Sequence, residues 1–535
     1  MMKKTIFGKF LAIAMIFAGF SLTSCDEKDN AIIDGQVYVK PEVQLVDGGA
    51  VIKATTISDI NRMLARIRKD VFDAGEPFAI KINAPALTTT LLENTISLPT
   101  ANGTDIIVEF TNPIATSDDA PLIIQSIGVA DNAWPEESNN VVEINFAAGT
   151  SDIDLGLNMP KSTVTLKGAT IDELVALTAK NTLIIENGVT VNWLQLLKDT
   201  HAVVKEGGKV LGAIADNGLD GHKKGVQFGR VWNNEIPKEE PTEDDYYYVQ
   251  NAKVIKNEDG NLVPIRLIGS EDEEQENVPE IIITDGAYAW VDIITEEGEQ
   301  PTYVNITGEG NATMMPNGAD WGSGPGLWAG NRLELDWVMN LTNVTVDYSK
   351  YLKFDSETWK YIETELIGYE ETTEISLPIN SENCTFKAKR FFGSADKFSE
   401  DIVLSTHKGS TFDNLGYEDE VDGIFYVIFP EQSKDRKTFN LSFDSCEFEQ
   451  AGFNTWFNGD DEKFDGFKAY MTFDNSKVGG KAITKNTEMI TNVGNRYYEE
   501  KPVTSTFFVI DGVTYVPVHV VEPENKWILN PVEEE

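Results

Sequence analysis

The chain has 535 residues, which is longer than one ordinary globular core, so several domains or a repeat array are expected. Its 87 acidic and 44 basic residues give a formal net charge of −43. A field this negative repels phosphate backbones and anionic lipid headgroups, so nucleic acid is not expected as a partner. The same charge is compatible with divalent cations.

The first residues have the pattern of a secretory signal. Lys3, Lys4 and Lys9 give a positive start, and an apolar run follows over 10–20. A membrane-spanning helix needs about 20 apolar residues, so this run is too short to span. We therefore expect residues 1–24 to be a signal peptide.

The tetrapeptide LTSC at 22–25 closely resembles the lipobox of bacterial lipoproteins. The resemblance implies cleavage before Cys25 and acylation of Cys25, so that the chain is held to a membrane by lipid. Asp26, Glu27 and Asp29 resemble the export tags of surface lipoproteins of the Bacteroidetes. This implies a place in the outer membrane, facing the cell exterior. The alternatives are a secreted protein with a chance cysteine, and a short charged tether.

An amphipathic helix is expected over 55–75, because apolar residues recur there at helical spacing. Ser58 is the expected N-cap and Gly75 the expected end. Such a helix suits the open end of a β-solenoid, where it covers apolar side chains and unpaired strand edges.

A repeat of about 20 residues follows. The segments VTLKGATI, IIENGVTV and VKEGGKVL align Gly168, Gly188 and Gly208, and the third residue after the last glycine is Leu211. A further turn is expected at Gly149, about one residue out of phase. Units this short cannot bury an apolar face alone, so they are expected to stack.

A second set of repeats lies downstream. SFDSCEFEQAG and TFDNSKVGGKA match at an offset of 30, which aligns Phe443 with Phe473 and Phe448 with Val478. NLTNVTVDY and NSENCTFKA are related segments. The alternation indicates β-strands, and the repeated Asn or Ser indicates a turn.

These patterns resemble the right-handed parallel β-helix proteins of pectate-lyase-like architecture, over about 77–220 and 330–490. The implied fold class is all-β, a right-handed parallel β-helix or solenoid with a short N-terminal α-helical cap. The alternative is a string of tandem β-sandwiches. Sandwich strands also alternate, but they do not predict equal offsets.

Composition suggests where the chain divides. The segment NNEIPKEEPTEDD is acidic and rich in proline, so it is interpreted as a linker or long loop. The expected parts are a signal peptide (1–24), a tether with a first strand (25–50), a first solenoid half (51–232), the acidic linker (233–245), a second solenoid half (246–500), and a C-terminal part with a hairpin at Asp511 and Gly512 (501–535).

Cys384 and Cys446 occupy equivalent positions in the second set of repeats. Neighbouring coils are about 4.8 Å apart, and at least two coils are expected between the two cysteines. A disulfide needs Cα atoms within about 7 Å. We therefore expect two free thiols that face inward and pack as small apolar groups.

Tryptophan residues are the candidates for sugar contact. Trp321 and Trp328 lie in the glycine-rich segment 315–331, where an exposed indole would offer a flat face to a sugar ring. Trp456 is a further candidate. The alternative is that this segment folds back on the solenoid as a plug.

The segment KAKR is the most basic patch of the acidic chain. Lys387, Lys389 and Arg390 are candidate contacts for an acidic ligand such as an acidic sugar, and Lys389 or Arg390 is a candidate lyase base. The favoured alternative is charge balance against neighbouring acids.

Asp460, Asp461 and Asp465 form a candidate calcium site, because calcium prefers hard oxygen ligands. The alternative is a solvated acidic loop, and no other cofactor is expected. The histidines lie in no metal-ligand motif and are expected at the surface or in turns; they are His201, His222, His407 and His519.

The sequence therefore favours a non-catalytic cell-surface lipoprotein that binds a glycan or another extracellular partner on a β-helix scaffold. It contains no nucleotide-binding glycine motif and no serine-nucleophile elbow. The family resemblance implies a polysaccharide lyase or glycoside hydrolase as one alternative. A protein-binding adhesin or assembly component is the other.

Overall fold

The computed structural model forms two compact units, residues 1–220 with 227–255 and residues 221–226 with 256–535. The structure describes residues 32–33, 36–37, 40–85, 87–99, 105–117, 119–127, 140–178, 181–196, 200–215, 231–255, 263–268, 278–294, 302–314, 337–347, 350–355, 360–365, 374–376, 379–388, 390–393, 402–414, 438–449, 468–483, 487–498, 501–510, 512–520 and 526–532. Among these residues, no helix has both the length and the apolar character that a membrane crossing requires.

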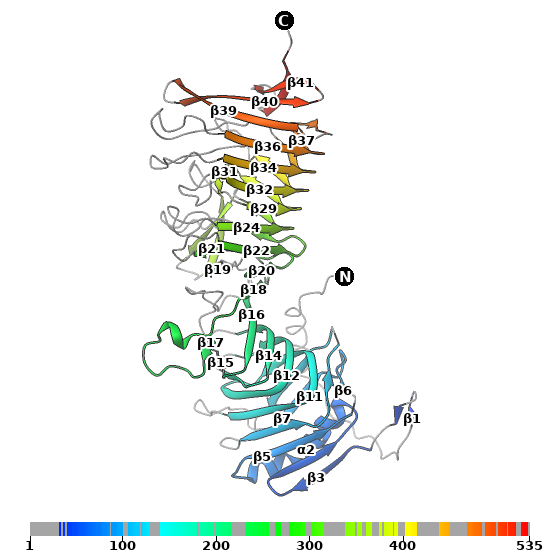
Figure 1. Cartoon of the computed structure of the whole chain (residues 1–535). Helices are drawn as coiled ribbons and strands as arrows, with labels where there is room; N and C mark the ends of the chain where they lie inside the picture. The colour runs from blue at the N-terminus through cyan, green and yellow to red at the C-terminus, as the bar shows by residue number, and fades with distance from the viewer. Residues whose placement is uncertain are drawn as a thin grey trace. The chain divides into compact units, whose positions relative to one another are not determined.

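Unit 1 begins with a hairpin and a helix, followed by stacked strands (Figure 1). Its helix is α2 (Ile57–Asp73), and a short 3-10 helix, η1, spans Glu243–Asp245. Its strands are β1 (Ile32–Ile33), β2 (Gln36–Val37), β3 (Glu42–Val46), β4 (Gly49–Lys53), β5 (Phe78–Asn83), β6 (Leu87–Thr88), β7 (Thr95–Pro99), β8 (Ile106–Phe110), β9 (Ile114–Ala115), β10 (Leu122–Ile127), β11 (Asn140–Asn158), β12 (Ser162–Ala176), β13 (Thr182–Ile185), β14 (Thr190–Gln195), β15 (His201–Val204), β16 (Lys209–Ala215), β17 (Val231–Asn233) and β18 (Asn251–Val254).

The strands of unit 1 stack in parallel from one coil to the next. One series runs β4, β5, β8, β11, β12, β13, β15 and β17. The other runs β7, β10, β11, β12, β14, β16 and β18. β11 and β12 bend and contribute to both series. Alternate residues face inward along these strands, as in β12, and fill the space between the series with aliphatic side chains.

The predicted helix is confirmed, but its N-cap is Thr56 and not Ser58. The Thr56 hydroxyl accepts a hydrogen bond from the backbone N–H of Asp59 at 3.1 Å. At the other end, Ala74 is the C-cap and Gly75 follows with a φ of +67°, the left-handed conformation that glycine adopts without strain. Ser58 lies inside the first helical turn, and its hydroxyl donates to Glu93.

α2 covers the free edge of β7 and lies beside β4 and β3 at one end of unit 1 (Figure 1). The side-chain amide of Asn61 donates to the carbonyl of Thr95 at 2.7 Å. Its oxygen accepts from the N–H of Ser97 at 2.9 Å. One carboxamide therefore makes both hydrogen bonds that a neighbouring strand would make to these two residues.

Left-handed glycines turn four successive coils of unit 1. Gly149, Gly168, Gly188 and Gly207 all have φ between +80° and +88°. The third position of the predicted repeat is wrong by one residue, because the corner residue there is Gly207 and not Gly208. In the same coil Val210 pairs with Val191, and Leu211 points to solvent.

The acidic segment 233–245 returns to β17 within unit 1. Trp232 forms an antiparallel bridge with Tyr246, and the N–H of Tyr247 donates to the carbonyl of Val231 at 3.0 Å. Unit 1 continues through β18 and ends at Ile255.

Unit 2 is also built of strands that stack in parallel. They are β19 (Val263–Ile268), β20 (Glu280–Ile283), β21 (Tyr288–Ile294), β22 (Thr302–Gly308), β23 (Thr313–Met314), β24 (Trp337–Thr342), β25 (Thr345–Asp347), β26 (Lys350–Asp355), β27 (Lys360–Glu365), β28 (Glu374–Ser376), β29 (Ile379–Glu382), β30 (Thr385–Ala388), β31 (Arg390–Gly393), β32 (Ile402–Lys408), β33 (Thr411–Asn414), β34 (Thr438–Asp444), β35 (Glu447–Phe448), β36 (Lys468–Asp474), β37 (Lys477–Val478), β38 (Lys481–Ala482), β39 (Thr487–Tyr498), β40 (Lys501–Ile510), β41 (Val513–Val520) and β42 (Lys526–Pro531).

Two series of strands carry the coils of unit 2. β20, β22, β24, β29, β32, β34 and β36 form one. β19, β21, β23, β25, β30, β33, β35 and β37 form the other. The predicted alignments of Phe443 with Phe473 and of Phe448 with Val478 are confirmed. Parallel pairing between coils is the pattern of a β-solenoid and not of antiparallel sandwiches.

The turns between the two series repeat the same conformation. Asn343, Asn383, Gly409 and Ser445 have φ between +54° and +60°. The backbone N–H of each donates to a carbonyl of the next coil, at 2.8 to 2.9 Å. The coil over 402–414, with Gly409 at its corner, is one that the sequence repeats above do not include.

Cysteine and serine alternate just after these corners. Cys384 and Cys446 are buried free thiols, as predicted. The backbone N–H of Cys384 donates to the Ser410 hydroxyl at 3.2 Å, and that of Cys446 donates to the Ser476 hydroxyl at 3.1 Å. Burial raises the pKa of both thiols to about 11, so they are protonated at neutral pH.

Aromatic rings stack along the core of unit 2. Phe386, Phe412 and Phe448 lie in consecutive coils with ring centroids 5.1 and 4.4 Å apart. Phe443 and Phe473 form a second stack at 5.0 Å. Phe412 and Phe443 meet edge to face, which is a favourable aromatic geometry.

An antiparallel meander ends the parallel stack. β39 pairs antiparallel with β36, and β40, β41 and β42 follow in order. Ile510 lies opposite Val513, which confirms the hairpin predicted at this point of the sequence.

Candidate functional site

The outward side of β25, β30, β33 and β35 carries two columns of polar side chains. Thr345, Thr385 and Thr411 form what we call the hydroxyl column, because they pair in register from coil to coil. Two residues further along each strand stands the charged column, which consists of Asp347, Lys387, Asp413 and Glu449. Neighbouring members of one column are about 4.8 Å apart, the spacing of paired strands.

The strands place these columns outward because the residue between them faces the core. Val346, Phe386 and Phe412 separate the two columns in three successive coils, and each is buried. Since alternate residues of a strand point to opposite faces, the threonine before and the charged residue after each of them share the outer face.

The hydroxyl column differs from the asparagine column on the other series of strands. Asn380 donates to Asn340 at 3.0 Å, and Asn340 donates to Asn305 at 2.9 Å. The Asn380 oxygen also accepts from the N–H of Thr406. These carboxamides are therefore hydrogen-bonded to one another along the stack. The hydroxyls of Thr345, Thr385 and Thr411 make no hydrogen bond to another residue that the structure describes.

Lys387 is partly neutralised in this face. Its ammonium lies 3.8 Å from the Asp347 carboxylate, and Asp413 pairs with it in register on the following coil. This is the charge balance that the sequence also allowed. Lys389 lies outside the described residues, and Arg390 is in β31, where only its backbone is described.

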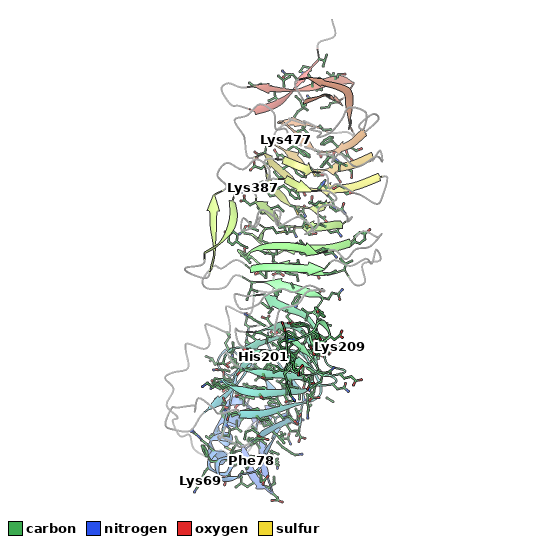
Figure 2. The ribbon with its side chains drawn as sticks, turned by 90° about the vertical axis from the view of Figure 1, so that its left-hand side faces the viewer. Lys69, Phe78, His201, Lys209, Lys387 and Lys477 are labelled. Atoms are coloured by element: carbon green, nitrogen blue, oxygen red, sulfur yellow. The ribbon has the colours of Figure 1, made fainter. Side chains whose placement is uncertain are left out.

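Asp413 and Glu449 are a close pair of carboxyl groups. Desolvation raises the pKa of Glu449 above its usual value, and the charge of Asp413 and the hydrogen bond with it raise it further. Glu447 makes an ion pair with Lys477 at 2.5 Å instead. Figure 2 shows Lys387 and Lys477 at different levels of the stack.

Several candidate residues lie outside the described part of the chain. They are Cys25, the tryptophans Trp321, Trp328 and Trp456, and the acidic residues Asp460, Asp461 and Asp465. Among the described residues, no group of three or more His, Cys, Asp or Glu side chains is arranged to hold a metal ion.

An aromatic cluster in unit 1 was not among the candidates from the sequence. The Trp232 ring stacks on Tyr246, with centroids 5.0 Å apart. His201 lies at the edge of the indole, where its Nδ1 accepts a hydrogen bond from the indole N–H at 2.9 Å. Because Trp232 is only 8% exposed, this cluster anchors the returning loop and offers no free indole face. The run of three tyrosines at 246–248 was the available signal.

His407 is the clearest departure from the sequence prediction. It was expected at the surface or in a turn, but it is fully buried in β32. Its ring stacks on Phe443 at 5.1 Å. Nδ1 lies 2.7 Å from the Ser381 hydroxyl, and Nε2 lies 3.1 Å from the Ser405 hydroxyl. Desolvation lowers the pKa of His407 to about 3, so this imidazole is a neutral part of the core.

No family model matches the chain, and no curated protein or solved structure shows a significant similarity to it.

Proposed function

We propose that the chain is a non-catalytic, lipid-anchored protein of the outer cell surface, whose solenoid binds an extracellular glycan along the outer face of unit 2. The observation that carries the proposal is the hydroxyl column, Thr345, Thr385 and Thr411. It repeats polar groups at the spacing of the coils, which is similar to the length of one sugar residue in an extended chain.

The neighbouring charged column suits an uncharged polar ligand that exchanges hydrogen bonds with both columns. Lys387 supplies a donor, and Asp347 and Asp413 supply acceptors. Trp321 and Trp328 supply the aromatic contact in this proposal. Acylated Cys25 holds the protein to the membrane, and a right-handed parallel β-helix provides the long rigid scaffold.

A glycan array tests the proposal, using a chain with Cys25→Ser, with calcium and with chelator. We expect calcium-independent binding that Thr385→Val with Thr411→Val weakens, and that Trp321→Ala with Trp328→Ala also weakens. Thr163→Val is the matched control, because Thr163 has a similar half-buried outward position on β12 of unit 1. Product release over time would replace the proposal with a lyase or hydrolase. Binding to no glycan would point to a protein partner.

A further inference from the structure

The line of hydroxyl groups on unit 2 is longer than the hydroxyl column itself. Thr313 of β23 pairs in register with Thr345, and Tyr288 of β21 pairs with Thr313. Ala289 and Met314, the next residues of these two strands, are buried, so Tyr288 and Thr313 lie on the outer face. Five successive coils, from β21 to β33, therefore carry a hydroxyl at the same position. We call these five residues the five-coil column.

The stack of coils holds the backbone of this column in place and leaves its hydroxyls free. The backbone N–H of each of the four threonines donates to a carbonyl of the preceding coil, at 2.8 to 3.2 Å. All five side chains of the column are half-buried. The hydroxyls of Tyr288 and Thr313, like those of the hydroxyl column, make no hydrogen bond to another residue that the structure describes. The strands therefore fix five hydroxyls in a line without using their hydrogen bonds.

The two ends of the five-coil column differ. After Thr411 the same position is taken by Glu447 and then by Lys477, and these two exposed side chains form an ion pair at 2.5 Å. The other end is the half-buried ring of Tyr288, which makes no ring contact with another residue in the described ranges. A ligand on the column would meet hydroxyls along its whole length, an aromatic ring at one end and an ion pair at the other.

The charges beside the column disfavour an anionic ligand. In the charged column, Asp347, Asp413 and Glu449 outnumber the single cation Lys387, whose ammonium already lies 3.8 Å from the Asp347 carboxylate. A uronic or sulfated sugar would be repelled by the two carboxylates and would have to displace Asp347 from the lysine. A neutral sugar meets no such repulsion, because its hydroxyls can donate to the carboxylates and accept from the ammonium.

We propose that the ligand is a neutral, β-1,4-linked hexose chain that lies along the five-coil column, with about one sugar residue for each coil. This inference rests on the proposed function and names its ligand class. Equatorial β-1,4 linkages keep a sugar chain straight, so its rings can follow a straight column, whereas an α-1,4-linked chain curves away. The sugar at the end of the column packs on Tyr288, because one face of a hexose ring presents apolar CH groups to an aromatic ring.

The test is a calorimetric titration of the full chain, with Cys25→Ser, against cello-oligosaccharides of increasing length. Each sugar residue that gains a hydrogen bond should tighten binding by about two- to tenfold. We expect this gain to continue up to five sugar residues and then to stop, because the column has five coils. Maltopentaose has the same composition as cellopentaose but α-1,4 linkages, and it should bind about tenfold more weakly or worse.

Variants at the aromatic end make the test specific. Tyr288→Ala should weaken the binding of cellopentaose by about three- to tenfold and should move the end of the length series from five sugar residues to four. Tyr288→Phe keeps the ring, so the series should still end at five. Thr342→Val is the matched control and should change nothing, because Thr342 is a half-buried outward threonine of β24 in the same unit that lies outside the column. Denaturant unfolding checks that each variant is folded.

The outcomes separate this inference from the proposed function. Tighter binding of acidic than of neutral glycans, equal affinity for cellopentaose and maltopentaose, or a length series that Tyr288→Ala leaves unchanged would each overturn the inference. In those cases the proposed function would stand as long as Thr385→Val with Thr411→Val weakens the binding that is seen. Binding to no glycan on the array would remove the proposed function, and this inference with it.

Discussion

His407 fills a place in unit 2 where the stack of coils changes from polar to aromatic. On one side it hydrogen-bonds to Ser381, and on the other it stacks on Phe443. An imidazole satisfies both neighbours because it is an aromatic ring with two hydrogen-bonding nitrogens. In the neutral ring both nitrogens have a hydrogen-bond partner, so burial leaves no polar group of His407 unpaired. Burial makes the charged form of the ring very unfavourable.

Acid should therefore destabilise unit 2 through His407. The pKa of this residue is about 3 in the folded state, against 6.5 for a histidine side chain in water, as in the unfolded chain. Between these values the unfolded chain binds a proton that the folded chain does not, so stability is full above pH 6.5 and falls as the pH is lowered. We expect a loss of about 2 to 3 kcal/mol from this residue at pH 4.5.

The comparison of the wild-type chain with His407→Phe isolates this effect. Ser381 keeps a hydrogen bond to Ser410, and Ser405 keeps one to the carbonyl of Ile379, so neither hydroxyl is orphaned by the change. Denaturant unfolding at several pH values should show a stability difference between the two chains that changes between pH 6.5 and pH 4. A difference that is constant over this range would contradict a neutral buried His407.

At the scale of single elements, the corner glycines of unit 1 share a conformation but not a neighbourhood. Gly168 and Gly188 have φ of +80° and +81°. A Cβ on Gly168 would stand 2.5 Å from the carbonyl oxygen of Phe146, whereas a Cβ on Gly188 would meet nothing within 4 Å. The two positions separate the cost of the backbone conformation from the cost of a clash.

We expect Gly188→Ala to lower the free energy of unfolding by about 1 to 2 kcal/mol, the cost of the left-handed conformation. Gly168→Ala should cost about 1 to 3 kcal/mol more, because the backbone of the previous coil must move away from the new methyl group. Denaturant titration of the two variants measures the difference. Equal losses would mean that the coils adjust freely at this corner.

Asn61 makes a second prediction at this scale. Asn61→Ala leaves the carbonyl of Thr95 and the N–H of Ser97 without their partner at the covered edge of β7. An unsatisfied buried polar group costs about 1 to 3 kcal/mol, so the variant should be less stable by at least that amount. Arg66→Ala on the exposed side of the same helix should change stability by less than about 0.5 kcal/mol. Thermal unfolding of both variants checks this, and a harmless Asn61→Ala would mean that water replaces the amide.

The helix and the strands were more predictable than the particular residues at their caps and corners. The apolar spacing of α2 and the match of Phe443 with Phe473 are local patterns, and the structure contains both. Thr56 caps the helix in place of Ser58. Both residues have a hydroxyl that can cap a helix, and the choice depends on the backbone conformation, which the sequence does not show. Gly207 replaces Gly208 at the corner for the same reason, because the sequence does not show which of two adjacent glycines has the left-handed conformation.

The coil over 402–414 shows why the candidate site could not be predicted completely from the sequence. Thr411 and Asp413 belong to the two outward columns. Their coil, however, carries His407 where the following coil carries Phe443, and Gly409 where its two neighbours carry Asn383 and Ser445. A search of the sequence for repeats with phenylalanine and asparagine or serine at these positions does not find this coil. The pairing of Asp413 with Glu449 depends on coil stacking, and no spacing in the sequence announces it.

At the scale of the whole molecule, each unit has its own core. The buried aliphatic residues of β11 and β12 belong to unit 1, and the aromatic stacks belong to unit 2. We expect calorimetry to resolve two transitions, since two separate cores need not unfold together. His407→Phe should move one transition and Gly168→Ala the other. A single transition that both substitutions shift equally would show that the units unfold as one.

The spacing of the coils in unit 2 has a consequence for how such a chain changes over generations. Equivalent residues of successive coils are 40, 26, 36 and 30 residues apart, although the corner keeps the same backbone conformation. The segments that join the coils therefore differ in length without disturbing the corner. A lineage can vary the segments that join its coils and test new recognition surfaces, while selection on folding acts on a few residues around each corner.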